Sequence, residues 1–173
     1  KESAIPPWRL INNAMKFNEH IKRRWKVKYE GLQTLAMVLR QGDWGFTLDL
    51  KDGYYALWLA EISRGLLAGR VEVTAKMAEL LVREGLATWE QMRTLPDGGY
   101  EVFLQPKGLV MGFTNSCAIF TKLTRQVAKY WRKKGVRLVH LMDDFSFFAA
   151  TYLEAIKLRD EVLKDLEELG FYV

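Results

Sequence analysis

The sequence predicts an α+β fold, because strand patterns and helix patterns both recur along it. Residues 138–148 carry Leu, Val and Phe on each side of two adjacent carboxylates, as the strands of a buried hairpin do. Residues 46–50 alternate apolar and polar, which is typical of a strand with one buried face. Residues 115–134 and 151–170 space their apolar side chains as amphipathic helices do. These segments predict a hairpin, a further strand and two long helices.

Composition limits the kind of protein. A chain of 173 residues, of which 49% are hydrophobic and 27% charged, suits one domain with a packed core. The net charge of +5 favours polyanionic partners, although many unrelated basic proteins share it. No uninterrupted apolar run reaches membrane-spanning length and no signal-peptide pattern opens the chain, so we expect an intracellular protein without a membrane partner. A single cysteine, Cys117, excludes an internal disulfide, and neither His20 nor His140 has a partner pattern for a zinc site or a catalytic dyad.

The first part of the chain predicts a short strand at residues 8–13 and a helix at residues 29–40, which Gly42 ends. The alternating strand at residues 46–50 follows. Residues 22–29 interleave basic and aromatic side chains, a pattern that can neutralise phosphates and stack on bases. A solvated charge run with core-facing aromatic rings is at least as common an origin of such a pattern.

The middle of the chain predicts a smaller group of elements. A strand is expected at residues 70–73, and a short helix is expected to begin with the capping-box pattern at residues 88–91. A turn at residues 96–99 leads into a strand at residues 100–104. Residues 74–85 predict an amphipathic helix with three apolar residues on one face, namely Met77, Leu80 and Leu81.

The two long helices have recognisable ends. Asn115 or Ser116 can cap the first helix, and a capping box at Thr151 and Glu154 opens the second. Gly112 permits a backbone conformation or a close approach that a side chain would block. The first helix is expected to bury five side chains: Ile119, Phe120, Leu123, Val127 and Trp131. The second is expected to bury Ile156, Val162, Leu163 and Leu166, and residues 171–173 begin a further strand.

Asp143 and Asp144 lie between apolar flanks, at the expected tip of the hairpin. Two carboxylates in such a place are costly unless a metal ion or hydrogen bonds compensate their charge. An ordinary solvated turn is the alternative, which a further carboxylate nearby would disfavour. Asp49 supplies that carboxylate, because it shares the polar face of its strand with Thr47. Carboxylate oxygens are the ligands that Mg²⁺ prefers, so the three acids predict a site for a hard divalent cation.

Three segments of the sequence carry a family resemblance. FTLDLKDGYYAL (46–57), GFTNSCAIFTKL (112–123) and LMDDF (141–145) follow the order and spacing of polymerase motifs A, B and C. The chain resembles the fingers–palm region of reverse transcriptases, with retrotransposons of the tyrosine-recombinase and long-terminal-repeat types as the nearest groups. The resemblance implies a right-hand polymerase fold lacking the thumb, in which two helices back an antiparallel palm sheet. The implied subdivision is fingers at about residues 1–42 and 60–112, and palm at about residues 43–59 and 113–173.

The resemblance implies an RNA-directed DNA polymerase of a retroelement that joins nucleotides by two-metal-ion catalysis. Asp49 and Asp143 are the implied ligands of two Mg²⁺ ions, with Mn²⁺ as a substitute, and Asp144 is the implied supporting acid. The implied partners are an RNA or DNA template with its primer, and deoxynucleoside triphosphates. A downstream thumb and RNase H regions of the same polyprotein are further implied partners.

The resemblance also assigns binding residues. Tyr54, five residues after Asp49, falls where the family places an aromatic ring against the sugar of the incoming nucleotide, which excludes a 2′-hydroxyl. A packed core tyrosine is the alternative for Tyr54, and a surface arginine is the alternative for Arg9. The implied nucleotide-binding residues are Arg9, Leu50, Tyr54, Met111 and Gly112. The implied template–primer residues are Asn115, Ser116 and Met142.

Departures from the family pattern keep a second hypothesis open. Met15 stands where an Arg is common, and Val110 and Cys117 each replace a proline. A domesticated or decayed descendant could bind nucleic acid or partners without polymerising, although the intact acids favour the polymerase. A palm-fold RNA polymerase or nucleotide cyclase fits motif C but not Tyr54 or motif B. Residues 74–98 form an insertion that could be a fingers elaboration, a docking surface or a spacer.

Overall fold

The computed structural model describes residues 13–173. The strand expected at residues 8–13 lies almost entirely outside these residues. Five helical segments are short: α1 (Met15–Glu19), α2 (Leu32–Val38), α3 (Gly53–Ala56), α4 (Glu61–Arg64) and the 3-10 turn η1 (Gly65–Leu67). None of the helices in the described part is long and apolar enough to cross a membrane.

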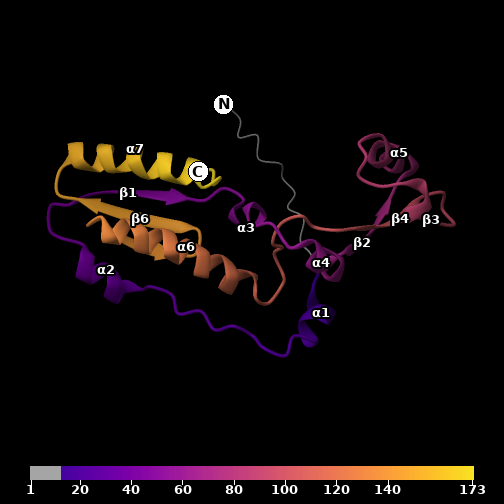
Figure 1. Cartoon of the computed structure of the whole chain (residues 1–173), viewed down its shortest axis with the longest axis horizontal. Helices are drawn as coiled ribbons and strands as arrows, with labels where there is room; N and C mark the ends of the chain where they lie inside the picture. Colours follow the sequence, from indigo (N-terminus) through magenta and orange to yellow (C-terminus); the bar gives the residue numbers. More distant parts are fainter. Residues whose placement is uncertain (1–12) are drawn as a thin grey trace.

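The larger sheet has the strand order β1-β6-β5 and is antiparallel throughout (Figure 1). Its strands are β1 (Trp44–Asp49), β5 (Arg137–Leu141) and β6 (Asp144–Ala149). The hairpin of β5 and β6 and the separate strand β1 confirm the strands predicted from the apolar patterns. The register pairs Leu48 with Phe145 and Phe46 with Phe147, so the apolar residues of both strands share one face.

Two long helices cover that apolar face, as predicted. They are α6 (Ser116–Lys133) and α7 (Tyr152–Glu168), and the capping box at Thr151 is formed. The ring of Trp131 on α6 lies edge-on to Phe145 and Phe147, with centroid distances of 5.3 and 5.4 Å. Its indole nitrogen donates a hydrogen bond of 2.8 Å to Asp165 on α7. Trp131 therefore joins both helices to the sheet.

The opposite face of the sheet is open. Thr47 and Asp49 on β1 are exposed on it, as the alternation predicted, and Asp144 on β6 is exposed beside them. The sheet thus has one face for the core and one face for solvent or a ligand.

The edge strand β5 is covered by α2, which is shorter than the predicted helix at residues 29–40. Glu30 precedes α2, and its carboxylate accepts hydrogen bonds from the His140 backbone at 2.9 Å and from Arg132 at 2.7 Å. At the other end, Arg137 donates to the Val38 carbonyl at 2.8 Å and pairs with Asp43. Hydrogen bonds to β5 and α6 hold the residues on both sides of α2 outside a helical conformation. The helix is therefore shorter at both ends than predicted.

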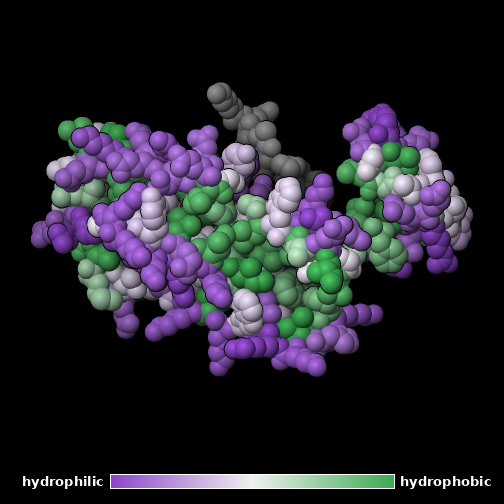
Figure 2. Space-filling model, viewed as in Figure 1, coloured by the Kyte–Doolittle hydropathy of each residue, from purple (hydrophilic) through white to green (hydrophobic). Residues whose placement is uncertain are grey.

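A second, smaller lobe lies apart from the larger sheet (Figures 1 and 2). Its sheet has the order β2-β4-β3, from β2 (Gly69–Val73), β3 (Met92–Thr94) and β4 (Tyr100–Leu104). The helix α5 (Ala75–Arg83), capped by Thr74, confirms the predicted helix, and the predicted capping box opens only a 3-10 turn, η2 (Trp89–Gln91). β3 was not predicted, because three residues are too few to show a strand period.

The apolar residues of two helices are less buried than their spacing suggests. On α5, Met77 and Leu80 share the predicted apolar face but are 47% and 38% exposed, and the structure buries Ala78. On α6, Phe120 and Trp131 are buried as predicted, but Leu123 is 40% exposed. The lobe sheet consists of three short strands, so it offers too little surface to cover the whole apolar side of α5.

Replacing Trp131 with alanine should lower the free energy of unfolding by about 3–5 kcal/mol, because it removes a fully buried ring and the hydrogen bond between α6 and α7. Urea denaturation measures the change. The neighbouring Tyr130, which is 48% exposed, provides the matched control, and Tyr130→Ala should cost less than about 1 kcal/mol. Equal losses in the two variants would contradict a core centred on Trp131.

Candidate active site

The turn between β5 and β6 carries the acidic pair. Met142 has a positive φ of 60°, in the left-handed region that favours glycine, and Asp143 follows it. Asp144 is the first residue of β6, so the turn consists of Met142 and Asp143 rather than of the two aspartates as predicted. A non-glycine residue in this conformation is held there by its surroundings.

Two buried side chains hold this turn through a single atom. The carbonyl oxygen of Met142 accepts a hydrogen bond of 2.8 Å from His140 Nε2 and lies 3.2 Å from the hydroxyl of Thr124 on α6, which shares its one proton with the Phe120 carbonyl at 3.1 Å. The ring of His140 also lies against Phe145, with centroids 4.7 Å apart. His140 thus supports the turn, and sequence reasoning missed both this bond and the role of Thr124. Neither residue carries a sequence pattern that would have shown them.

The register of the sheet places the backbones of the three predicted acids at one end of the sheet. Asp49 ends β1 directly opposite Asp144, and the backbone N–H of Leu50 donates a hydrogen bond of 3.2 Å to the carbonyl of Asp143. Asp49 and Asp144 are exposed on the open face, and Asp143 is half-buried. Their carboxylate oxygens are the donor type that suits a hard divalent cation. Within residues 13–173, no three His, Cys, Asp or Glu side chains are grouped closely enough to hold a metal ion.

Tyr54 lies close to the acidic turn. Its half-buried ring meets Phe120 of α6 edge-on, with centroids 4.9 Å apart. Burial raises the pKa of the Tyr54 hydroxyl, and the neighbouring Cys117 thiol and the charge of Asp143 raise it further. The phenol, which is neutral at physiological pH even with its ordinary pKa, thus stays neutral over a wider range of pH. Leu50, predicted to touch the nucleotide, has its side chain in the core, so only its backbone is available for such a contact.

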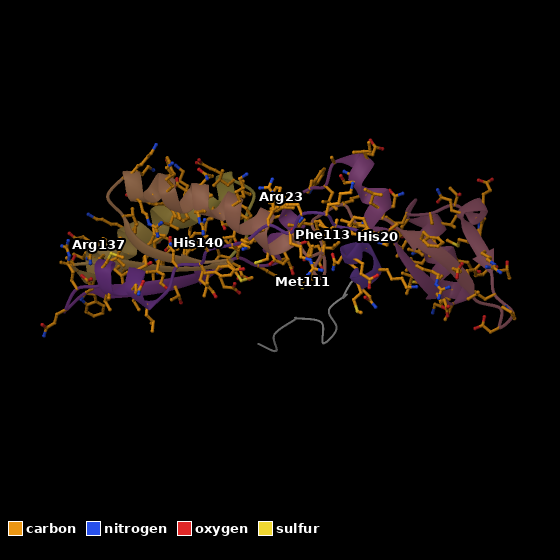
Figure 3. All side chains as sticks on the ribbon, turned by 90° about the horizontal axis from the view of Figure 1, so that it is seen from below. His20, Arg23, Met111, Phe113, Arg137 and His140 are labelled. Atoms are coloured by element: carbon orange, nitrogen blue, oxygen red, sulfur yellow. The ribbon has the colours of Figure 1, made fainter. Side chains whose placement is uncertain are left out.

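The loop before α6 is held by a residue that sequence reasoning missed. Asn18, on α1, donates a hydrogen bond of 2.8 Å to the Gly112 carbonyl and accepts one of 2.9 Å from the Thr114 backbone. Gly112 has a φ of 93°, which explains the glycine at this position. Met111 and Phe113 flank it near the middle of the molecule, between the sheet that carries His140 and the smaller lobe (Figure 3).

The side chains of Asn115 and Ser116 form hydrogen bonds with backbone groups of neighbouring segments. The amide of Asn115 is buried, accepting from the Trp25 backbone at 3.0 Å and donating to the Arg23 carbonyl at 3.2 Å. Ser116 is also buried and donates to the Val110 carbonyl at 2.6 Å. Neither side chain caps α6, in contrast to the prediction. Their contact with a template stays a prediction, as does the role of Arg9, which lies outside the described residues.

A basic groove runs between residues 23–27 and the first turns of α6, with a volume of about 790 Å³. Lys122 lies over the ring of Trp25, at 5.4 Å from the ring centroid. The groove contains no acidic lining residue among those described, and its basic lining residues are Arg23, Arg24, Lys26, Lys122 and Arg125. An exposed aromatic ring among cations is suited to the phosphates and bases of a nucleic acid.

Comparisons with known proteins agree on one family. A family model described as reverse transcriptase (RNA-dependent DNA polymerase) matches residues 6–173. A foamy viral protease-reverse transcriptase in complex with double-stranded DNA has a similar fold, with a TM-score of 0.63 and 23% identity over 96% of this chain. A second structure of that foamy viral protein with double-stranded DNA gives a TM-score of 0.59 and 23% identity over 91% of this chain. The chain spans only 24% and 26% of these two solved chains. No curated protein sequence matches the chain significantly.

The buried ring of His140 should make stability depend on pH. Burial lowers the pKa of His140, so below about pH 6.5 the unfolded chain binds a proton that the folded chain resists. The free energy of unfolding should therefore fall as the pH drops from about 7.5 to about 5.5. His140→Gln keeps a donor for the turn and should remove this part of the pH dependence, which urea denaturation at several pH values measures. Replacement of the exposed His20 by Gln is the control. If the free energy of unfolding of His140→Gln depends on pH as that of the wild type does, the assignment is contradicted.

Proposed function

This chain belongs to the reverse transcriptase (RNA-dependent DNA polymerase) family, and we propose that it is the nucleotide-joining region of an RNA-directed DNA polymerase from a retroelement. The observation that carries this proposal is the convergence of Asp49, Asp143 and Asp144 at one end of the larger sheet. The first lies 94 residues from the second in the sequence, and the three side chains belong to the open face and its turn. The proposed reaction is the elongation of a primer on the RNA template of a retrotransposon.

Asp49, Asp143 and Asp144 are the proposed ligands of two Mg²⁺ ions, with Mn²⁺ as a substitute. Members of this family generally use divalent metal ions. When bound, such ions lower the pKa of the primer 3′-hydroxyl and neutralise charge on the pyrophosphate that leaves. The protein contributes the position of the carboxylates, which the β1–β6 register and the hydrogen bonds to the Met142 carbonyl hold in place. Exposure of Asp49 and Asp144 leaves their side chains room to turn toward a cation.

The incoming nucleotide is proposed to lie beside Tyr54. The neutral phenol, held against Phe120 near the acidic turn, would meet the sugar and leave no room for a 2′-hydroxyl. Met111 and Gly112, and the backbone of Leu50, are the proposed neighbours of the nucleotide, with Arg9 as a phosphate ligand. Met142 is a proposed contact of the primer. Asn115 and Ser116 would act on the template indirectly, by fixing residues 23–25 and residue 110.

The template is proposed to follow the basic groove. Its cations and the exposed Trp25 supply the sequence-independent contacts that a polymerase needs. The titles of the two similar solved structures name complexes with double-stranded DNA, which supports a nucleic-acid partner. The subdivision into fingers (about residues 1–42 and 60–112) and palm (about residues 43–59 and 113–173) is part of this proposal, as are a downstream thumb and RNase H regions.

Asp143→Asn should abolish primer extension, lowering the rate by about a hundredfold or more, because it removes a charge at the reacting phosphate. The measurement is extension of a primer on an RNA template with deoxynucleotides and Mg²⁺, using the natural chain that contains these 173 residues. Asp160→Asn, which removes the same group from the exposed surface of α7, is the control and should extend normally. A folded wild-type protein that binds template–primer without extending it would instead favour the binding-only descendant.

Arg24→Ala/Lys26→Ala should weaken binding to template–primer on any sequence. If each cation meets one phosphate, the slope of log affinity against log salt should become shallower by about 1.4–1.8. Fluorescence anisotropy at several salt concentrations gives the slope. Lys157→Ala/Lys164→Ala removes two exposed cations from α7 and is the matched control. If both double variants change the slope equally, net charge rather than the basic groove determines binding.

A further inference from the structure

An ion pair binds the outer edge of the larger sheet. β5 is an edge strand, so the backbone groups on its outer side have no neighbouring strand to bond. The Glu30 carboxylate accepts a hydrogen bond of 2.9 Å from the His140 backbone, and Arg132 donates one of 3.0 Å to the Leu138 carbonyl. The same nitrogen of Arg132 donates to Glu30 at 2.7 Å. The pair thus bonds to β5 where a further strand would.

Glu30 also ends the segment that lines the basic groove. Residues 23–30, the groove segment, form neither a helix nor a strand, and side chains on and just before α6 hold them. At the start of the segment the Asn115 amide bonds to two backbone groups, and further along Arg125 donates to the Lys28 carbonyl. The ion pair of Glu30 is the last of these contacts. It therefore fixes the end of the segment on α6.

The same carboxylate supports the acidic turn through His140. It binds the backbone of His140, and the ring of His140 donates to the Met142 carbonyl at 2.8 Å. Met142 has a φ of 60°, a conformation that its surroundings must hold, and Asp143 is the next residue. Two successive hydrogen bonds thus connect Glu30 with the residue that precedes Asp143.

We propose that Glu30 is a positioning residue, whose carboxylate holds the groove segment and the acidic turn in one arrangement, so that a template in the groove is aligned with the acids. The inference rests on the proposed function, because it gives Glu30 a task in the joining of nucleotides. Glu30 belongs to none of the three motifs that carry the family resemblance. An ion pair that only stabilised the fold would not affect how the groove and the turn are placed relative to each other.

Glu30→Ala, made in the natural chain that contains these 173 residues, removes the acceptor that His140 and Arg132 share. Because the turn then loses its fixed position, kcat for primer extension should fall about tenfold. The Kd for template–primer should rise about fivefold, the effect of one ordinary hydrogen bond. Glu30→Gln keeps an oxygen acceptor of the same reach and should stay within about threefold of wild type in both quantities.

Asp43→Ala is the matched control. It removes a carboxylate that pairs with Arg137 at the opposite end of β5, and this pair is more buried than the pair that Glu30 forms. Along the long axis of the molecule, Arg137 lies farther from Arg23 of the groove segment than His140 does (Figure 3). Asp43→Ala should lower the free energy of unfolding at least as much as Glu30→Ala and leave kcat and Kd unchanged. Equal losses of kcat in the two variants, or a wild-type value of kcat or of Kd in Glu30→Ala, overturn the inference.

Hydrogen exchange separates this inference from the proposed function. The backbone amides of residues 141–144 should exchange faster in Glu30→Ala than in the wild type or in Asp43→Ala, because the turn loses its support. If the wild type binds template–primer without extending it, the proposed function fails, and an unchanged exchange rate or Kd in Glu30→Ala still overturns the inference. If Glu30→Ala does not fold, Glu30→Asp, which keeps the charge but has a shorter reach, takes its place and should lower kcat about threefold.

Discussion

The antiparallel register between β1 and β6 is the constraint on which the rest of the molecule depends. Pairing Leu48 with Phe145 places one row of apolar side chains under α6 and α7, and the same register places Asp49 opposite Asp144. A shift by one residue would move the apolar row of one strand to the open face and separate the acids. The hydrophobic core and the candidate active site are therefore fixed by the same backbone hydrogen bonds.

Helix α6 connects the parts of the site because its different sides contact different parts of the molecule. Trp131 and Phe120 are buried in the core, while Thr124 donates to the turn that carries Asp143. Lys122 and Arg125 line the basic groove on the outside. A rigid helix of this length keeps the acidic turn and the groove at a constant separation, which a substrate that spans both requires.

Buried polar side chains keep the surrounding loops in one conformation. The buried Asn115 and Ser116 each bond to a backbone group in another segment, and the buried His140 bonds to the turn. In the described part of the chain, no buried side-chain nitrogen or oxygen lacks a hydrogen-bond partner. Since an unsatisfied buried polar group is costly, these bonds specify the loop positions as strongly as apolar packing specifies the strands.

The sequence alone determined the strands other than β3 and the longer helices of this protein, because their signals are local. Alternation at residues 46–50, the capping box at Thr151 and the apolar flanks of the acidic pair each act within a few residues. The order of the three motifs also identified the family. Local patterns do not show how much surface a neighbouring element offers, so the exposure of Met77 and of Leu123 followed only from the fold.

Only the tertiary structure decided which side chains meet. Glu30 binds the backbone of His140 across 110 residues, and this bond helps to make α2 begin later than its apolar spacing predicts. Asn18 binds the backbone on both sides of Phe113 across more than 90 residues, although nothing in the sequence links the two segments. Such pairings depend on the distance between elements after packing. The spacing of residues within one element gives no information about that distance.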